Sequence, residues 1–415
     1  MDYHVFREKD KCYLYLPTYK QAFIIKDDEY HVLEQNLPRK NIILKSYSDK
    51  LKDSRKQKNS VDNKRYELYL CVSNDCNARC IYCYAQFGNY GKPKGIMTEA
   101  VAYDSIDYFF NHISDDALVI VTFFGGEPLM ASNIIKKSCM YITNKYTDRK
   151  VEFHITTNAT LITDDIADLF LKYRFKVVIS IDGGATIQNV QRPLVGGTDS
   201  FEKIIRIIPE LFERRIPVAA RGTYVVGNYN LKEAYEDLIN LKFERINIVP
   251  DFFSIRTDDR LSILMEQLEE LYEYIVFYAK YNSNFPFSSF AKRIRQLFLP
   301  ICNSTDLCNA GKNTFAIDLC GDIYPCQRFS GDVNSKIGNI RNDKKLLIFV
   351  PREMDCSKCW NINTCMHRCQ HIQNQESKSI QNYYCMYSKK MTEICIRLCT
   401  VLTKEQLLSI VRRCD

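Results

Sequence analysis

The stretch Cys76-Asn77-Ala78-Arg79-Cys80-Ile81-Tyr82-Cys83 carries three cysteines, separated by three residues and then by two. It follows the run Glu67-Leu68-Tyr69-Leu70-Cys71-Val72, whose apolar and aromatic residues are typical of a buried strand. Three thiolates hold three irons of a 4Fe-4S cube, and the fourth iron is then open to another ligand. A zinc knuckle or reduced structural thiols fit the same spacing, so the loop by itself leaves these alternatives open.

The composition indicates an ordinary globular protein of two or three domains. The 415 residues are 46% hydrophobic and 26% charged, with a mild net charge of +7. No apolar run approaches the about 20 residues of a membrane span, and Met1-Asp2-Tyr3-His4 does not begin a signal peptide. We therefore expect a cytoplasmic protein without a membrane partner, in which 18 clustered cysteines indicate metal ligands rather than disulfides.

Strand and helix patterns alternate regularly after Tyr66. The strand candidates are residues 68–73, 119–124, 152–156, 177–181, 218–225 and 246–249, and the helix candidates are about 98–113, 132–146, 163–173, 200–214, 230–241 and 258–281. Six such units predict an α/β fold with a parallel sheet, whose chemistry gathers at the carboxyl ends of the strands. Periodicity does not distinguish a partial barrel from an open sheet.

A second motif, Phe123-Phe124-Gly125-Gly126-Glu127-Pro128, follows the second strand. Glycines let a ligand approach the backbone, and Glu127 adds an acceptor suited to an ammonium group. A tight strand-to-helix turn uses the same residues, so the motif by itself is not specific. Later strand ends carry Thr156-Thr157-Asn158-Ala159 and Ser180-Ile181-Asp182-Gly183, polar groups that bind ligands but also serve as ordinary loop residues and helix caps.

The three-cysteine loop, followed one strand-helix unit later by the glycine motif, resembles the radical SAM superfamily. The resemblance implies a partial (β/α)6 TIM-like barrel and a 4Fe-4S cluster on Cys76, Cys80 and Cys83, whose open iron binds S-adenosylmethionine. It implies that reduction of this cofactor yields a 5'-deoxyadenosyl radical, which removes a hydrogen atom from an unactivated carbon. The residues implied to contact the cofactor are Tyr82, Gly125, Gly126, Glu127, Asn158, Ser180, Asp182 and Arg192.

Eight further cysteines recur near the C-terminus as Cys302-x5-Cys308, then Cys326, then Cys356-x2-Cys359-x5-Cys365-x3-Cys369, and finally Cys385. This series is similar to the SPASM extension, a small C-terminal domain that binds two auxiliary 4Fe-4S clusters. The resemblance assigns Cys302, Cys308, Cys326 and Cys369 to the first cluster, and Cys356, Cys359, Cys365 and Cys385 to the second. A pair of zinc ribbons is the structural alternative. Cys320 falls outside the series.

The predicted domains are a small appendage (1–38), a basic linker (39–65), the radical SAM barrel (66–285), the SPASM domain (286–387) and a C-terminal helix (388–415). In the appendage we expect strands at Lys11 to Leu16 and Gln21 to Ile25, then a helix at Asp27 to Gln35. This order resembles the start of a winged-helix leader-peptide-binding module, although the segment is short for a complete one. A hairpin and helix that pack on the barrel are the alternative.

The residues after Cys326 narrow the predicted reaction. Sulfatase-maturating relatives carry an Asp directly after this cysteine, whereas this chain has Gln327. The stretch Tyr324-Pro325-Cys326-Gln327-Arg328-Phe329 looks more like enzymes that join a cysteine sulfur to a carbon. The hypothesis is therefore thioether formation in a ribosomally synthesised precursor peptide, with a flavodoxin- or ferredoxin-type reductant.

Other functions stay open at this point. Carbon-carbon or ether crosslinking, epimerisation and anaerobic formylglycine maturation are alternatives within the same family. A non-catalytic iron-sulfur protein that transfers electrons or binds peptides is an alternative from another class. Nucleic-acid binding is not expected, because the basic residues lie mainly in the 39–65 segment without interleaved aromatic residues.

Overall fold

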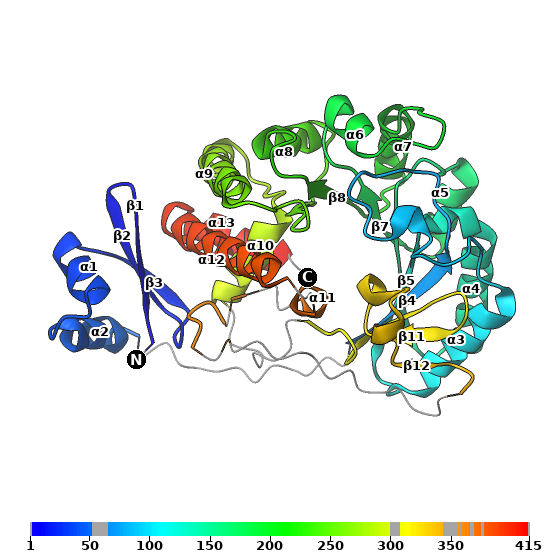
Figure 1. Ribbon diagram of the computed structural model, residues 1–415, viewed down its shortest axis with the longest axis horizontal. Helices are drawn as coiled ribbons and strands as arrows, with labels where there is room; N and C mark the ends of the chain where they lie inside the picture. The colour runs from blue at the N-terminus through cyan, green and yellow to red at the C-terminus, as the bar shows by residue number, and fades with distance from the viewer. Residues whose placement is uncertain are drawn as a thin grey trace. The chain divides into compact units, whose positions relative to one another are not determined.

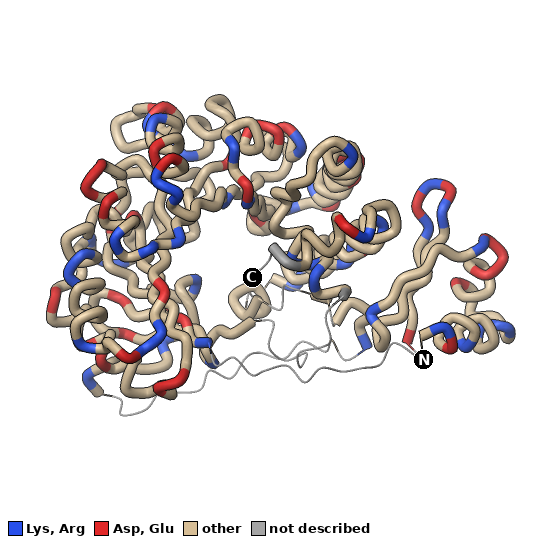
Figure 2. Tube along the Cα trace, turned by 180° about the vertical axis from the view of Figure 1, so that it is seen from behind, with Lys and Arg blue, Asp and Glu red and all other residues tan. Residues whose placement is uncertain are grey.

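A computed structural model describes residues 2–51, 65–298, 308–342, 356, 358–362, 364–365, 369–374 and 377–413. The chain divides into two compact units. Unit 1 combines Met1–Val61, Arg256–Cys308 and Glu353–Asp415, and unit 2 combines Asp62–Ile255 and Asn309–Arg352. Among the described residues, no helix is both long enough and apolar enough to cross a membrane. Acidic and basic residues are interspersed over both units (Figure 2).

Unit 2 is built on a nine-stranded sheet with the order β12-β11-β10-β4-β5-β6-β7-β8-β9. Its parallel strands are β4 (Arg65–Ser73), β5 (Leu118–Gly125), β6 (Lys150–Thr157), β7 (Lys176–Ser180), β8 (Val218–Tyr224) and β9 (Ile246–Pro250). Because these neighbouring strands all run parallel, their carboxyl ends meet at one edge of the sheet. This arrangement confirms the predicted α/β fold with a mostly parallel sheet.

Helices connect the parallel strands and line one face of the sheet (Figure 1). They are α3 (Glu99–Asn111), α4 (Ser132–Lys145), α5 (Asp164–Lys172), α6 (Ala185–Gln191), α7 (Phe201–Glu213) and α8 (Leu231–Asn240), with the short turns η2 (Gln86–Gly88) and η3 (Pro128–Ala131) between them. Sequence reasoning missed α6. Its buried residues are Gln188 and Gln191, so it has no apolar stripe by which to recognise it.

The two faces of the sheet differ in polarity. On β4, Leu68 and Leu70 are buried, whereas Glu67 and Tyr69 alternate with them and are half-buried. Thr122 of β5 donates to Glu67 across this second face at 2.9 Å. The opposite face of β4 thus combines the polar pair Glu67 and Thr122 with a hydrophobic cluster around Tyr69 and Cys71.

Three short strands extend the sheet beyond β4. They are β10 (Thr314–Ile317), β11 (Asp322–Tyr324) and β12 (Gly338–Asn339), followed or separated by the turns η4 (Gln327–Phe329) and η5 (Val333–Ser335). β10 pairs parallel to β4, with Phe315 opposite Leu68, and the next two pairings are antiparallel. Residues Asn309–Arg352 thus cluster with the parallel strands, although the sequence groups them with the cysteine-rich segments at 286–387. A pairing of residues so far apart in the chain has no local signature.

Unit 1 joins an N-terminal sheet to helices from later in the chain. The antiparallel sheet contains β1 (His4–Glu8), β2 (Lys11–Leu16) and β3 (Gln21–Ile25). The helices are α1 (Asp27–Glu34), α2 (Lys40–Asp49), α9 (Asp258–Tyr281), α10 (Ser288–Phe298), α11 (Gln370–Gln373), α12 (Lys378–Val401) and α13 (Lys404–Arg413). The His4 ring stacks on Trp360, with centroids 3.7 Å apart, and its Nε2 lies 2.8 Å from Glu393 of α12.

Three expectations for unit 1 need correction. The strand β1 was not predicted, and α2 occupies part of the segment expected to be a linker from residue 39. Ile43, Leu44 and Tyr47 form one buried face of α2 and join the core with Leu14, a pattern obscured by the surrounding basic residues. At the other end, α12 begins at Lys378 rather than at 388, and α13 is a separate helix. Residues 52–64 of the expected linker lie outside the described residues.

Candidate functional site

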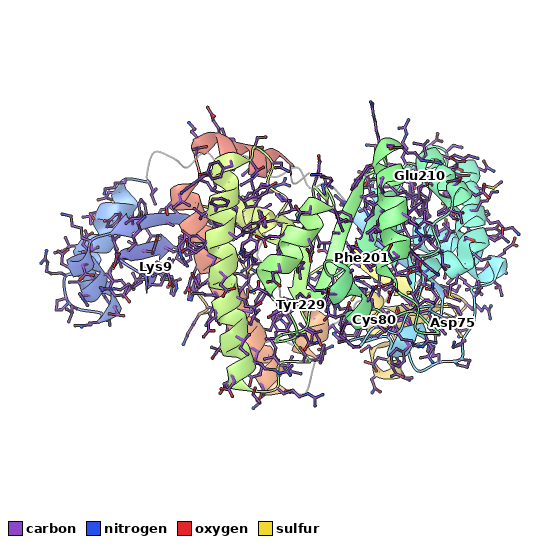
Figure 3. All side chains as sticks on the ribbon, turned by 90° about the horizontal axis from the view of Figure 1, so that it is seen from above. Lys9, Asp75, Cys80, Phe201, Glu210 and Tyr229 are labelled. Atoms are coloured by element: carbon purple, nitrogen blue, oxygen red, sulfur yellow. The ribbon has the colours of Figure 1, made fainter. Side chains whose placement is uncertain are left out.

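The cysteine loop leaves the carboxyl end of β4 and is held by the segment that follows α6. The Arg79 amide donates to the Pro193 carbonyl at 2.7 Å, and the Ile81 amide donates to the Gln191 carbonyl at 3.0 Å. Ala78 forms an isolated antiparallel bridge with Leu194. Figure 3 marks Asp75 and Cys80 in this part of unit 2. Backbone contacts far apart in the chain therefore fix the conformation of the loop.

The three thiols of the loop share one environment. Cys76, Cys80 and Cys83 are free and half-buried. The pKa of Cys76 is raised to about 12, mainly by burial and in smaller part by nearby charge on Glu127, Cys80 and Cys83. Among the residues that the structure describes, no group of three or more His, Cys, Asp or Glu side chains is gathered around a position for a single metal ion. Three neighbouring thiols on one loop suit a cluster, because each iron of a cube takes its own thiolate.

Glycines let the end of β5 pack directly on this loop. Gly125 has a φ of +139°, and a Cβ placed on Gly126 would lie 2.3 Å from the Asp75 carbonyl oxygen. The Gly126 amide donates to the Ser73 carbonyl, and the Glu127 amide donates to the Asp75 carbonyl, both at 2.8 Å. The predicted ligand-approach glycines are thus required by contacts within the protein itself.

Glu127 is 1% exposed and accepts three hydrogen bonds. The donors are the Thr157 hydroxyl at 2.6 Å, the Asn158 amide at 2.7 Å and the Leu129 amide at 3.0 Å. Burial nevertheless raises the pKa of this carboxyl to about 7. Glu127 therefore ties η3 to the end of β6, and a contact with an ammonium group stays a prediction.

Asn158 links the end of β6 to the cysteine loop. Its side-chain nitrogen donates to the Asn77 side chain at 2.8 Å, and Asn77 donates to the Thr160 hydroxyl at 2.8 Å. The Asn158 side-chain oxygen accepts from the Thr160 amide and hydroxyl. Sequence reasoning selected Asn158 but missed Asn77 and Thr160. The one sequence signal for this network was that Asn77, a polar residue, lies inside the cysteine loop.

Asp182 brings three of the predicted residues together. It is 0% exposed and accepts from Tyr82 at 2.5 Å, from Arg192 at 2.9 Å, from Gln191 at 3.2 Å and from the Thr223 amide at 2.8 Å. The Arg192 guanidinium also lies over the Tyr82 ring, 5.3 Å from its centroid. Burial opposes the charge on Arg192, but Asp182 raises the pKa of the guanidinium.

Two details complete this part of the site. The Arg192 Nε is buried and has no hydrogen-bond partner within the described part of the chain. Ser180 is half-buried at the end of β7, which precedes Asp182 by two residues. The segment after β5 thus reaches the loop through backbone hydrogen bonds, and the segments after β6 and β7 reach it through the side chains of Asn158 and Asp182.

The cysteines of the first predicted auxiliary set are spread over both units. Cys302 lies outside the described residues. Cys326 belongs to unit 2, where it packs against a buried cluster that includes Cys71, and Cys308 and Cys369 belong to unit 1. This ligand set therefore stays a prediction. Cys320, outside the predicted series, is exposed.

The second predicted set lies entirely in unit 1. The pKa of Cys385 is raised to about 11, mainly by burial and in smaller part by nearby charge on Cys365, Cys356 and Cys359. The Cys359 amide donates to the Cys356 carbonyl at 3.0 Å, as in a tight turn. Cys356, Cys359 and Cys365 thus lie within electrostatic reach of Cys385 on α12, and their assignment to one cluster stays a prediction.

Sequence comparison identifies a family and several relatives. The model of the Radical SAM superfamily matches residues 70–241. An uncharacterised protein of Methanocaldococcus jannaschii is 31% identical over 301 residues, which are 71% of this chain and 96% of that protein. The radical SAM cyclopropyl synthase TigE of Paramaledivibacter caminithermalis is 28% identical over 50% of this chain and 46% of its own. A cysteine-type anaerobic sulfatase-maturating enzyme of Clostridium perfringens is 24% identical over 78% of this chain and 94% of its own.

Solved structures show the same fold. Native anSMEcpe with bound AdoMet and the Cp18Cys peptide has a TM-score of 0.68 at 20% identity, covering 85% of this chain and 100% of that one. Streptococcus suis SuiB bound to the precursor peptide SuiA has a TM-score of 0.51 at 16% identity, covering 91% and 96%. The family match spans the cysteine loop and every strand end that contributes to the site. This chain therefore belongs to the radical SAM superfamily of enzymes.

Proposed function

We propose that this enzyme installs a thioether crosslink, from a cysteine sulfur to a carbon, in a ribosomally synthesised precursor peptide. Membership of the superfamily implies S-adenosylmethionine and a 4Fe-4S cluster as cofactors. Six parallel strands in chain order support a partial (β/α)6 barrel, and the recurring cysteines support a SPASM domain. The relatives that bind or modify peptides support a peptide substrate, and we propose a flavodoxin- or ferredoxin-type protein as the electron donor.

The observation that carries this proposal is the side chain after Cys326. Formylglycine formation is expected to use a carboxylate there as base, but the residue is the amide Gln327 at the start of η4. The charged side chain of this turn is Arg328, whose guanidinium lies 5.2 Å from the centroid of the Tyr84 ring, next to Cys83. The residues after Cys326 are thus an amide, Gln327, and a cation, Arg328, and neither supplies the base that formylglycine formation requires.

In the proposed site, Cys76, Cys80 and Cys83 hold the first cluster. Tyr82, Gly125, Gly126, Glu127, Asn158, Ser180, Asp182 and Arg192 surround S-adenosylmethionine. Because Asp182 already accepts four hydrogen bonds, its role is to orient Tyr82 and Arg192. Arg192 keeps its Nε hydrogen for the cofactor carboxylate.

The auxiliary clusters are proposed at Cys302, Cys308, Cys326 and Cys369, and at Cys356, Cys359, Cys365 and Cys385. Each thioether removes a hydrogen atom from the acceptor carbon, and one proton and one electron from the cysteine. When bound, the cofactors supply a 5'-deoxyadenosyl radical for the hydrogen atom and an auxiliary 4Fe-4S cluster as acceptor for the surplus electron. The chain's own part is to exclude water and stray hydrogen donors from the carboxyl ends of the parallel strands.

The test is anaerobic incubation of the reconstituted enzyme with reductant, S-adenosylmethionine and a cysteine-containing precursor peptide encoded beside its gene. Mass spectrometry should show the loss of two hydrogens per crosslink, and the cysteine should resist alkylation. The triple variant C76A/C80A/C83A and a Cys→Ser peptide are the controls. An unchanged peptide while 5'-deoxyadenosine accumulates would count against thioether formation.

Sulfatase maturation is the second candidate, because the chain covers 94% of a sulfatase-maturating relative. Its product differs in kind: a sulfatase-derived peptide would lose the cysteine sulfur and gain an aldehyde that reacts with a hydrazide. Carbon-carbon or ether crosslinking and epimerisation would leave the cysteine open to alkylation. The same incubation therefore separates these reactions.

A further inference from the structure

Arg293 is the largest fully buried side chain of the described residues, at 0% exposure. It lies on α10 among Phe290, Ile294 and Leu297, which are apolar and buried as well. A guanidinium enclosed in this way is costly unless an anion or a full set of acceptors compensates it.

The hydrogen bonds of Arg293 leave its charge without an anionic partner. Nη1 donates to the Ser388 carbonyl at 2.5 Å and to the Thr392 hydroxyl at 2.6 Å. Within the described ranges, Nε and Nη2 have no acceptor, and no Asp or Glu pairs with the group. Arg397 offers the contrast, because this arginine of unit 1 is also buried but binds both carboxylate oxygens of Glu269 at 2.8 and 2.7 Å.

A short chain of hydrogen bonds connects Arg293 to Cys365. The Ser388 hydroxyl lies 3.2 Å from the Cys365 Sγ, to which it donates. Arg293 Nη1 at 3.4 Å and the Asn361 side-chain nitrogen at 3.2 Å both donate to the oxygen of this hydroxyl. Because both neighbours are donors, the hydroxyl proton is directed to the sulfur. Thr392 holds Asn361 in place at 2.8 Å.

We propose that Arg293 is the counter-ion of the iron-sulfur cluster held by Cys356, Cys359, Cys365 and Cys385, and that with Ser388 it raises the reduction potential of this cluster. The inference rests on the proposed function for the presence of the cluster. A 4Fe-4S cluster on four thiolates is a buried anion, which supplies the partner that the arginine lacks among the described residues. Arg293 and Ser388 are positioning residues, because they act through Cys365.

The direction of the effect follows from charge. One-electron reduction adds negative charge to the cluster, and both a nearby cation and a hydrogen bond to a ligand sulfur stabilise the reduced form. A higher potential favours uptake of the surplus electron that thioether formation releases. Arg293 and Ser388 would then make the second auxiliary cluster a better acceptor of this electron than it would be without them.

The experiment is an anaerobic potentiometric titration followed by electron paramagnetic resonance. The background is C76A/C80A/C83A, which leaves the two auxiliary clusters. R293Q should lower the ratio of reduced to oxidised cluster at a fixed ambient potential about tenfold, a shift of about 59 mV for one electron. R293K, which keeps the charge, should restore most of the potential, and S388A should lower it by a smaller amount. R397Q is the matched control and should leave the potential unchanged.

A second measurement does not depend on the potential. Loading with iron and sulfide should raise the melting temperature of the wild-type protein more than that of R293Q, because only the wild type gains an ion pair. S388A keeps the buried arginine and two of its hydrogen bonds, so it serves as the test if R293Q does not fold. A folded R293Q or S388A with a wild-type potential overturns the corresponding part of the inference.

The outcomes separate this inference from the proposed function. If C385A retains the full iron content, no cluster occupies this set, and the ligand assignment of the proposed function fails. If C385A loses iron but the potential and the loading-induced stabilisation of R293Q equal those of the wild type, the cluster stands and the role of Arg293 is wrong.

Discussion

Two buried carboxylates, Glu127 and Asp182, organise the strand ends around the cysteine loop. The sequence motifs singled out both residues as polar groups near the loop, but they did not indicate the hydrogen-bond donors that each residue has. Each accepts several hydrogen bonds from its own chain, so each is first a structural support. Their partners differ, because Asp182 forms an ion pair with Arg192, whereas the donors to Glu127 are neutral and burial raises the pKa of this carboxyl to about 7.

Glu127 predicts a pH dependence of stability. Its pKa is raised from 4.5 to about 7 in the folded protein, so the folded state holds a proton that the unfolded state has lost between these values. Stability contributed by this group is complete below the unfolded pKa and is lost as pH rises through the folded pKa. The expected loss is about 3 kcal/mol between pH 4.5 and 7.

The measurement is chemical denaturation of the cluster-free protein across this pH window, for the wild type and Glu127→Gln. The advantage of the wild type should shrink as pH rises, because glutamine does not titrate. Glu99→Gln, in an exposed pair with Lys137, is the control and should leave the profile unchanged. A constant difference between wild type and E127Q would show that the carboxyl is ionised throughout.

At the scale of elements, the junction between β5 and the cysteine loop depends on the absence of side chains. Gly126→Ala places a methyl group against the Asp75 carbonyl, at 2.3 Å before relaxation, so one of the two backbones has to move. We expect iron bound per chain to fall by about four atoms, the content of one 4Fe-4S cluster. The check is colorimetric iron analysis after anaerobic reconstitution.

Gly95→Ala is the matched control for this substitution. Its added methyl group would meet only the end of the Leu319 side chain, at 3.3 Å, which is free to turn aside. Full iron loading of G126A would show that the loop accommodates the displaced backbone.

The strands and helices with clear local patterns were predicted with accurate bounds, whereas β1, β10, β11, β12, α2 and α6 were not predicted. β2 and β3 have the predicted bounds, and the six parallel strands lie within a few residues of theirs, because short runs of apolar, β-branched and aromatic residues are visible locally in the sequence. The helix α2 was not predicted because basic residues obscure its apolar face. The helix α6 was not predicted because its buried residues are glutamines. Arg293 was also missed. Its spacing from Phe290 and Leu297 marks the buried face of α10, but arginine on a helix is usually exposed.

For the whole molecule, the cysteine inventory predicts the metal content. Three 4Fe-4S clusters correspond to about twelve iron atoms per chain, with an equal amount of sulfide. C76A/C80A/C83A and C356A/C385A should each retain about eight iron atoms per chain. Mass spectrometric metal analysis gives the result directly. Zinc in place of iron would instead support paired zinc ribbons and would remove the basis for radical chemistry.

The division into two units was beyond sequence reasoning. Each unit combines segments from separate parts of the chain, and the predicted domain series assumed continuous stretches. In unit 1, specific side-chain contacts join the first segment of the chain to the last. One of them is the stacking of His4 on Trp360. Such pairs are set by tertiary packing, so no local pattern of residues announces them.

This interleaving also sets an order of assembly on the ribosome. Translation releases Asp62–Ile255, including the cysteine loop, long before α12 emerges to complete the unit that began with β1. The N-terminal sheet is therefore synthesised long before α12, the helix with which it shares unit 1. Because Cys356 and Cys385 arrive with that partner, closing unit 1 and delivering its thiols are a single, terminal event of biosynthesis.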